Sequence, residues 1–116
     1  MIENRKFIRL KAPIGVVYKV LKNKSRRHKE TPSLVRDIGG GGICITAKDD
    51  LREGDLLKIQ IQIPHLKEPI EAIGEVIWFS PGQSERAPRE AGVRFRDITT
   101  QHMHQILEYV YTIGIG

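Results

Sequence analysis

Two short segments of this sequence hold the residues best suited to binding a ligand. Residues 5–9 (RKFIR) place Arg5 and Arg9 four positions apart. Residues 37–42 (DIGGGG) begin with an aspartate and contain four of the chain's eleven glycines. Glycine costs conformational entropy, so four together indicate positive φ angles, close approach of another group to the backbone, or both. A tight turn alone would need only one or two glycines.

The basic charge of the chain is concentrated around the first of these segments. The sequence has 19 Lys+Arg and 14 Asp+Glu, a formal net charge of +5. Residues 1–36 contain eleven basic and two acidic residues, a net +9, which leaves −4 on the other eighty residues. This asymmetry predicts a polyanionic partner: nucleic acid, a nucleotide or an anionic membrane surface. A solvated loop that only maintains solubility is the alternative.

The sequence favours a binding protein over an enzyme or a metalloprotein. Its one cysteine, Cys44, has no partner for a disulfide or a cysteine-based zinc site. His102 and His104 are two residues apart, so on a helix they diverge by roughly 200° instead of sharing a face. No apolar run has signal-peptide length or the ~20 residues that span a bilayer. We therefore expect a cytoplasmic protein with no membrane insertion, catalytic residue, metal or cofactor.

Alternation of apolar and polar residues predicts the elements that position the two segments. A chain of 116 residues allows one domain, and the alternation is clearest over Leu57–Ile63. A second strand covers Ile70–Trp78, and shorter candidates cover residues 15–21, 34–38, 43–46 and 92–95. Residues 22–32 and 80–90 are expected to be exposed loops. Six short strands at this spacing predict a closed or nearly closed antiparallel barrel.

The same alternation assigns a direction to individual side chains. On the second strand, Trp78 falls on the face of Val76 and the other inward positions, whereas Ile77 and Phe79 share the opposite, partly exposed face. On the last strand, Val93 and Phe95 are expected to point into the barrel. Arg94 and Arg96 are then expected to point out of it.

The C-terminal segment changes to a helical period. Thr99 is a suitable N-cap, and Gly114 stands where the helix is expected to end. Between them, apolar residues recur every three or four positions, which predicts one amphipathic helix docked on the barrel. These residues are Met103, Ile106, Leu107, Val110 and Ile113.

The two segments resemble the signature of PilZ domains, bacterial receptors for cyclic di-GMP. That signature is an RxxxR motif near the N-terminus and, about thirty residues later, a [D/N]xSxxG loop. Arg5 and Arg9 match the first motif, and Asp37, Gly39 and Gly42 fall on the second. The resemblance extends over nearly the whole chain. It implies a six-stranded antiparallel barrel of the split, Greek-key type with a C-terminal helix at 14–116, preceded by a flexible basic arm at 1–13.

The resemblance assigns Arg5 and Arg9 to the guanine edges and phosphates of cyclic di-GMP, because a guanidinium pairs with both and stacks on bases. Asp37 can accept hydrogen bonds from the Watson–Crick edge of guanine, and the glycine loop lets backbone N–H groups approach the ligand. For Trp78 an ordinary position in the barrel is the alternative to a ligand contact. Possible secondary ligand residues are Lys6, Arg36, Gly40, Gly41, Trp78 and Arg94.

Gly39 departs from the family pattern, because the family has a serine at this position. Losing its hydroxyl is expected to cost about 1–3 kcal/mol of binding energy, so binding should weaken but survive. The implied function is binding of cyclic di-GMP that orders the N-terminal arm and signals to an unidentified protein partner in motility, pilus, biofilm or exopolysaccharide control.

Two alternatives differ from this function. A PilZ-fold interaction module in pilus or motility machinery, with weak or no cyclic di-GMP binding, is consistent with Gly39. A small basic barrel that binds single-stranded nucleic acid is the other alternative. An aromatic content of 6% leaves few residues for the stacking platforms of such barrels, so nucleic acid is the less favoured partner.

Overall fold

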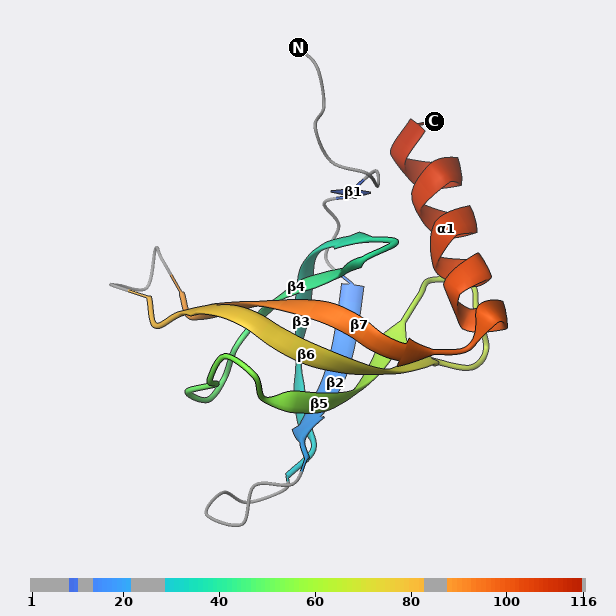
Figure 1. Cartoon of the computed structure of the whole chain (residues 1–116). Coiled ribbons are helices and arrows are strands. Elements are labelled where there is room, and N and C mark those ends of the chain that lie inside the picture. Colours follow the sequence, from blue (N-terminus) through green and yellow to red (C-terminus); the bar gives the residue numbers. More distant parts are fainter. Residues whose placement is uncertain (1–8, 11–13, 22–28, 83–87, 116) are drawn as a thin grey trace.

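A computed structural model describes residues 9–10, 14–21, 29–82 and 88–115 of the chain, which form seven strands and one helix (Figure 1). The strands are β1 (Arg9–Leu10), β2 (Ile14–Val20), β3 (Thr31–Gly39), β4 (Gly42–Thr46), β5 (Leu56–Gln62), β6 (Ile70–Ser80) and β7 (Glu90–Ile98). The helix is α1 (Thr100–Ile115). All six predicted strands are present, whereas β1 was not predicted. Residues 31 and 32, expected in the first loop, belong to β3, and Ser80 and Glu90, expected in the second loop, end β6 and begin β7.

Six of these strands close into an antiparallel barrel, which confirms the predicted fold. The order is β3-β2-β5-β6-β7-β4, and β3 also pairs with β4 to complete the circle. Strand β3 is long enough for both neighbours: Leu34 lies opposite Gly15 of β2, and Ile38 lies opposite Ile43 of β4. Strand β1 pairs with the end of β3, beyond the residues that β2 covers.

Apolar side chains of alternating residues fill the barrel. In β5, Leu57, Ile59 and Ile61 are completely buried, while Lys58 is exposed, as the period of two predicted. The core is built mainly from β-branched side chains, which suit pleated strands. The largest fully buried side chains are Tyr18, Val35, Ile38, Ile43, Ile45, Leu57, Ile59, Ile61, Ile63, Ile70, Val76 and Ile106.

A β-bulge in β6 reverses the predicted direction of Trp78. Val76 lies opposite Val93 and Trp78 lies opposite Gly92, so Ile77 is the extra residue. An extra residue shifts the alternation by one position. Val76 therefore points into the core, Ile77 and Trp78 are 49% and 41% exposed, and Phe79 packs against the core. The prediction that Trp78 shares the inward face of Val76 is wrong because a bulge depends on both strands of a pair.

Helix α1 begins where the sequence predicted. The Thr99 hydroxyl accepts a hydrogen bond of 3.1 Å from the His102 backbone N–H, which is N-cap geometry. Ile106 and Val110 are buried in the barrel core, but Ile113 is half exposed, so the apolar stripe leaves the barrel before its predicted end. The helix continues through the predicted stop at Gly114 to Ile115.

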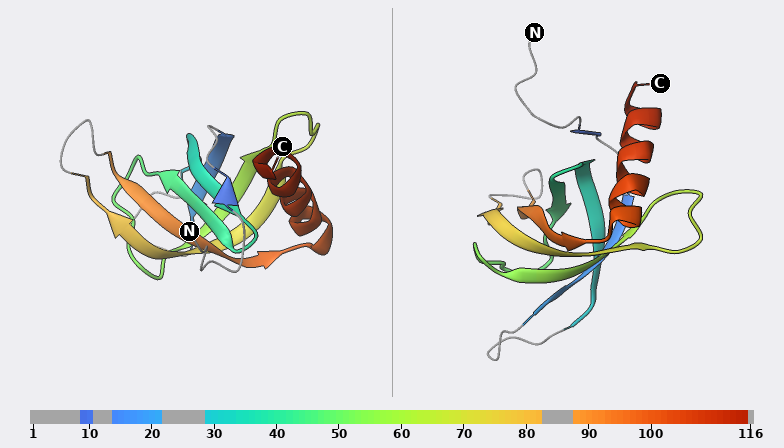
Figure 2. Two further views of the ribbon diagram at one scale, coloured as in Figure 1. Left: turned by 90° about the horizontal axis from the view of Figure 1, so that it is seen from above. Right: turned by 45° about the vertical axis from the view of Figure 1, so that its right-hand side comes forward.

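Helix α1 lies next to β1. The helix stands beside the barrel and contacts both β1 and β3, so the N-terminal strand and the C-terminal helix lie on the same side of the molecule (Figures 1 and 2). Within the described residues, α1 is the only helix, and it is neither long nor apolar enough to cross a membrane.

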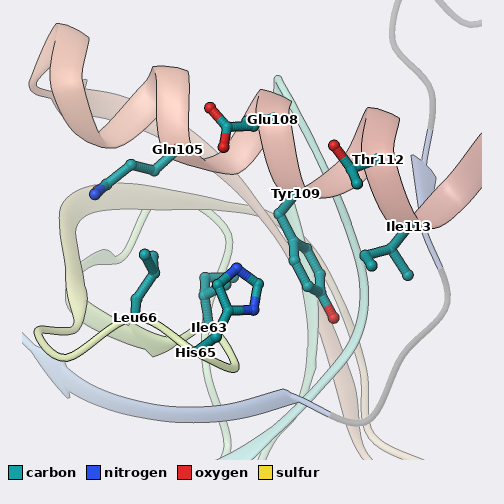
Figure 3. A pocket seen from close by; sticks show the side chains of 8 residues that line it. All are labelled: Ile63, His65, Leu66, Gln105, Glu108, Tyr109, Thr112 and Ile113. Carbon is teal, nitrogen blue, oxygen red and sulfur yellow. The ribbon is translucent and has the colours of Figure 1, made fainter.

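The loop between β5 and β6 packs beside α1. His65, at a φ of 65°, has its ring centroid 6.2 Å from that of Tyr109 (Figure 3). Together with other residues of the loop and helix, they line a small cavity of about 80 Å³. On α1 itself, His102 Nδ1 lies 3.2 Å from the backbone oxygen of Glu71, so this histidine contacts the start of β6.

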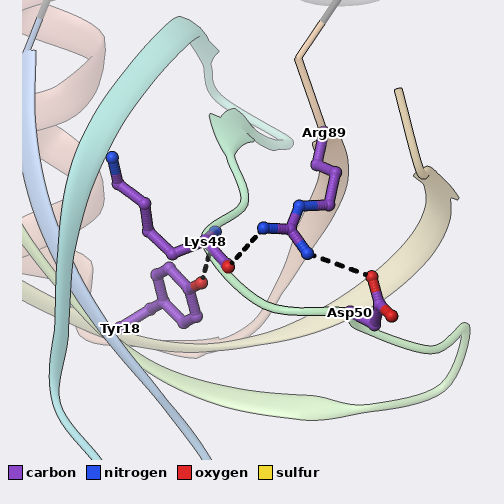
Figure 4. A network of polar contacts seen from close by, with 4 residues as sticks. All are labelled: Tyr18, Lys48, Asp50 and Arg89. Carbon is purple, nitrogen blue, oxygen red and sulfur yellow. Dashed lines mark hydrogen bonds and ion pairs between the residues drawn. The ribbon is translucent and has the colours of Figure 1, made fainter. Parts of the chain in front are cut away.

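A polar network anchors the segment that joins β4 to β5. The buried Tyr18 hydroxyl accepts a hydrogen bond of 3.0 Å from the Lys48 backbone N–H. The Arg89 guanidinium donates to the Lys48 carbonyl at 2.8 Å and pairs with the Asp50 carboxylate at 3.3 Å (Figure 4). These contacts fix the loop against a core residue of β2 and against the residue that precedes β7.

Candidate ligand-binding site on the outer face of the barrel

Strand β1 brings the two predicted motifs together. The backbone of Arg9 lies opposite that of Gly39, and Leu10 lies opposite Ile38. The last residue of the RxxxR segment is therefore next to the third residue of the DIGGGG segment, although thirty positions separate them in the sequence. Arg5 and Lys6 lie outside the described residues.

A cavity of about 410 Å³ lies beside this junction, on the outer face of the barrel. It collects residues from the end of β3, the β3–β4 bend and the paired strands β4, β7 and β6. Asp37 and Gly42 of the predicted site line it, as do Gly41, Trp78 and Arg94 of the secondary set. The complete lining is Asp37, Gly41, Gly42, Ile43, Cys44, Ile77, Trp78, Gly92, Val93 and Arg94.

Small residues account for this hollow on a strand surface. Gly42 lies opposite Arg94, and Cys44 lies opposite Gly92, so glycines and a buried cysteine alternate along the β4–β7 pair. A Cβ on Gly42 would collide with the Val93 backbone oxygen. The group that closely approaches the glycine run at this position is therefore the backbone of the paired strand β7. None of the four glycines at 39–42 has a positive φ, which removes the other predicted reason for them.

Two ion pairs flank the cavity. Arg94 lies 3.9 Å from the Glu75 carboxylate, which also binds Arg96 at 2.5 Å. Glu75 of β6 thus bridges two arginines of the neighbouring strand β7. Arg36, the fourth predicted arginine, does not line the cavity. Its Nε lies 3.6 Å from Glu90, and both side chains are partly exposed.

The predicted site residues therefore fall into three groups. Asp37, Gly41, Gly42, Trp78 and Arg94 surround the cavity, whereas Gly39 and Arg9 meet at its edge through backbone pairing. Gly40, in the bend between β3 and β4, and Arg36 do not line the cavity, and Arg5 and Lys6 lie outside the described residues.

The sequence interpretation missed Gly92, Ile77 and Cys44 as parts of this site. The signal for Gly92 was present, because a glycine inside a strand pattern often marks a position that another group approaches closely. Ile77 and Cys44 carry no such signal, since their place depends on a bulge and on strand pairing. The described residues contain no group of His, Cys, Asp and Glu that could hold a metal ion.

The fold and the cavity define a small β-barrel domain with a cavity on its outer surface. Comparison with known families is more specific: the sequence profile of the PilZ domain matches residues 3–112. The chain belongs to the PilZ domain family. No curated protein matches the sequence.

Three solved structures illustrate the likeness. The inhibitor of motility MotI/DgrA of Bacillus subtilis has a TM-score of 0.80 and 19% identity, with 98% of this chain and 53% of that chain covered. The PilZ domain of YcgR from Escherichia coli with c-di-GMP has a TM-score of 0.71 and 13% identity, with 97% of this chain and 93% of that chain covered. The PilZ domain of CeSA from a cellulose-synthesizing bacterium has a TM-score of 0.60 and 12% identity, with 91% of this chain and 97% of that chain covered. This chain spans about half the length of MotI/DgrA.

Proposed function

We propose that this protein is a receptor for cyclic di-GMP, as the PilZ domain of YcgR is solved with that ligand. The observation that carries the proposal is the pairing of Arg9 with Gly39 at the edge of a cavity that Asp37 and Arg94 line. One strand pairing thus joins both halves of the PilZ signature. Such a receptor requires no catalytic group.

The ligand presents two kinds of group, and the site offers a partner for each. Arg5 and Arg9 bind the phosphates and the O6/N7 edge of guanine, because a planar guanidinium donates two parallel hydrogen bonds to either. The Asp37 carboxylate accepts hydrogen bonds from the N1–H and N2–H of guanine. Gly39 leaves the backbone at the end of β3 open to the ligand, whereas Gly42 allows the close pairing of β4 with β7 beside the cavity. Arg94 adds positive charge on β7, directly opposite Gly42.

The signal passes from the ligand to the side of the barrel that carries α1. Ligand bound by the arm residues and by the end of β3 holds β1 in place, and β1 contacts the helix. Ordering of the arm then changes the surface that β1 and α1 present to a protein partner. We place that partner in motility, pilus, biofilm or exopolysaccharide control, in a cytoplasmic setting. MotI/DgrA is named as an inhibitor of motility.

Isothermal titration calorimetry tests this function. Cyclic di-GMP is added to the full chain and to Arg9→Ala, with GTP and a short oligonucleotide as control ligands. Arg52→Ala is the matched control variant, because Arg52 is exposed on the β4–β5 loop and does not line the cavity. We expect selective binding of cyclic di-GMP that Arg9→Ala abolishes and Arg52→Ala retains.

Two other results would contradict the proposal. Absence of cyclic di-GMP binding by the folded wild-type chain would favour an interaction module, for which Gly39 in place of the family serine is the supporting observation. Salt-sensitive oligonucleotide binding without a response to cyclic di-GMP would favour a nucleic-acid-binding barrel.

A further inference from the structure

We propose that Trp78, seated on Gly92, is a stacking platform for one guanine base of the ligand, beside the Asp37 carboxylate that selects guanine. The inference rests on the proposed function and deepens it. It assigns a nucleobase subsite to the part of the cavity on β7, which pairs with β4, and on β6, the next strand of the sheet.

The first step is the direction of the indole. The bulge at Ile77 turns Trp78 out of the core, which leaves the largest side-chain type 41% exposed. A tryptophan at this position of an uninterrupted strand would be buried among the core residues. The bulge therefore places an aromatic ring on the outer face, where β-bulges near binding sites commonly re-aim side chains.

The second step is how the indole is held. Trp78 and Gly92 are directly opposite each other on β6 and β7. A Cβ on Gly92 would collide with three indole atoms, Nε1, Cε2 and Cδ1 of Trp78, so the pyrrole ring occupies the space of the missing side chain. The ring is packed against backbone on one side, which reduces its freedom before a ligand arrives.

The third step is the set of polar groups that line the cavity with the indole. Trp78 lines it together with the Asp37 carboxylate and the Arg94 guanidinium. Arg94 lies 3.9 Å from Glu75 on the neighbouring strand, which restrains its position. A flat aromatic surface, a hydrogen-bond acceptor and a cation within one cavity are the groups that recognise a base and its phosphate. An aromatic ring alone would not distinguish bases, whereas Asp37 favours guanine, which has donors on its Watson–Crick edge.

The chain contains one tryptophan, so its fluorescence reports on this subsite alone. We expect cyclic di-GMP to quench the emission in a saturable manner, with the same Kd that calorimetry gives for the full chain. Cyclic di-AMP should bind at least tenfold more weakly. Trp78→Leu should raise the Kd for cyclic di-GMP about ten- to a hundredfold, whereas Trp78→Phe should retain most of the affinity because it keeps an aromatic face.

Tyr111→Leu is the matched control, because Tyr111 is an exposed aromatic residue of α1 outside the cavity. Binding by calorimetry with no change in fluorescence, or an unchanged Kd in Trp78→Leu, would overturn the stacking role while the receptor function stands. No binding by the wild-type chain would overturn the receptor function itself. Circular dichroism of each variant establishes that it is folded before its Kd is compared.

Discussion

The backbone of Arg9 lies directly opposite that of Gly39, where β1 pairs with the end of β3. One residue belongs to the RxxxR motif and the other replaces the serine of the [D/N]xSxxG motif. The departure from the family pattern is therefore located at the contact between the two motifs. A side chain added at Gly39 would be introduced next to the arm and next to the cavity that Asp37 lines.

Gly39→Ser should tighten cyclic di-GMP binding. A serine hydroxyl restores one hydrogen bond to a polar or charged ligand, which is worth about 1–3 kcal/mol, or roughly ten- to a hundredfold in Kd. Calorimetry of the full chain measures the change. Gly15→Ser is the matched control, because Gly15 lies in β2 and a Cβ there would make only an ordinary contact of 3.9 Å with Gln62. An unchanged or higher Kd for Gly39→Ser would contradict the assigned role of this position.

Amide hydrogen exchange should slow in β1 when cyclic di-GMP binds. Only two residues of β1 pair with β3, so few backbone hydrogen bonds hold the strand without a ligand. We expect protection of the amides of Arg5 and Arg9 in the complex alone. Tyr18 is the internal control, since β2 pairs with both β3 and β5 and should exchange slowly in either state. Equally slow exchange of the arm without ligand would exclude ordering of the arm as the signal.

The barrel could be predicted from the sequence because most of its strands follow a period of two. In β5, the alternation from Leu57 to Ile61 is regular, and each side chain has the predicted direction. Strand β1 has two residues, too few for any period to be detected. The bulge at Ile77 could not be predicted either, because the residue counts of β6 and β7 become unequal only when the strands pair.

The part of the candidate site that lies in one continuous segment could be predicted, whereas the part that depends on strand pairing could not. Asp37 and Gly42 belong to one continuous segment, which the family resemblance identified. Gly92 and Cys44 enter the cavity only through the pairing of β4 with β7. The run of glycines was correctly related to a close approach, but at Gly42 the approaching group is the Val93 carbonyl of β7 and not a ligand.

Gly92→Ala should destabilise the fold through a clash with Trp78. The added methyl group would occupy the position of the indole ring, so the ring or β7 must shift, at a cost of about 1–3 kcal/mol. Urea unfolding of four chains gives the coupling: wild type, Gly92→Ala, Trp78→Ala and the double variant. In the Trp78→Ala background the alanine at 92 should cost almost nothing. An equal cost in both backgrounds would show that the indole does not set the requirement for glycine.

Thr99→Ala should lower the free energy of unfolding by about 1 kcal/mol, because its hydroxyl caps α1 through the His102 N–H. The adjacent Thr100→Ala is the control, since Thr100 is exposed and is the first helical residue. Urea unfolding followed by circular dichroism should separate the two variants. Equal stabilities of Thr99→Ala and wild type would exclude a contribution from the cap.

Tyr18 should make the fold lose stability in alkaline solution. Burial raises the pKa of its hydroxyl above the ordinary value of about 10, although the hydrogen bond from the Lys48 N–H opposes this shift. The folded chain therefore holds this proton more tightly than the unfolded chain. The resulting stabilisation is complete below about pH 10, where both states are protonated, and is lost as the pH rises through the pKa of the folded state.

Tyr18→Phe removes this proton, so its free energy of unfolding should fall less steeply above pH 10 than that of the wild type. At pH 7 the variant should be about 1 kcal/mol less stable, because the Lys48 N–H loses its acceptor. Urea unfolding between pH 7 and pH 11 measures both effects. Tyr111→Phe is the control, since Tyr111 is an exposed tyrosine of α1. Parallel pH profiles for wild type and Tyr18→Phe would show that the buried hydroxyl does not cause the alkaline loss.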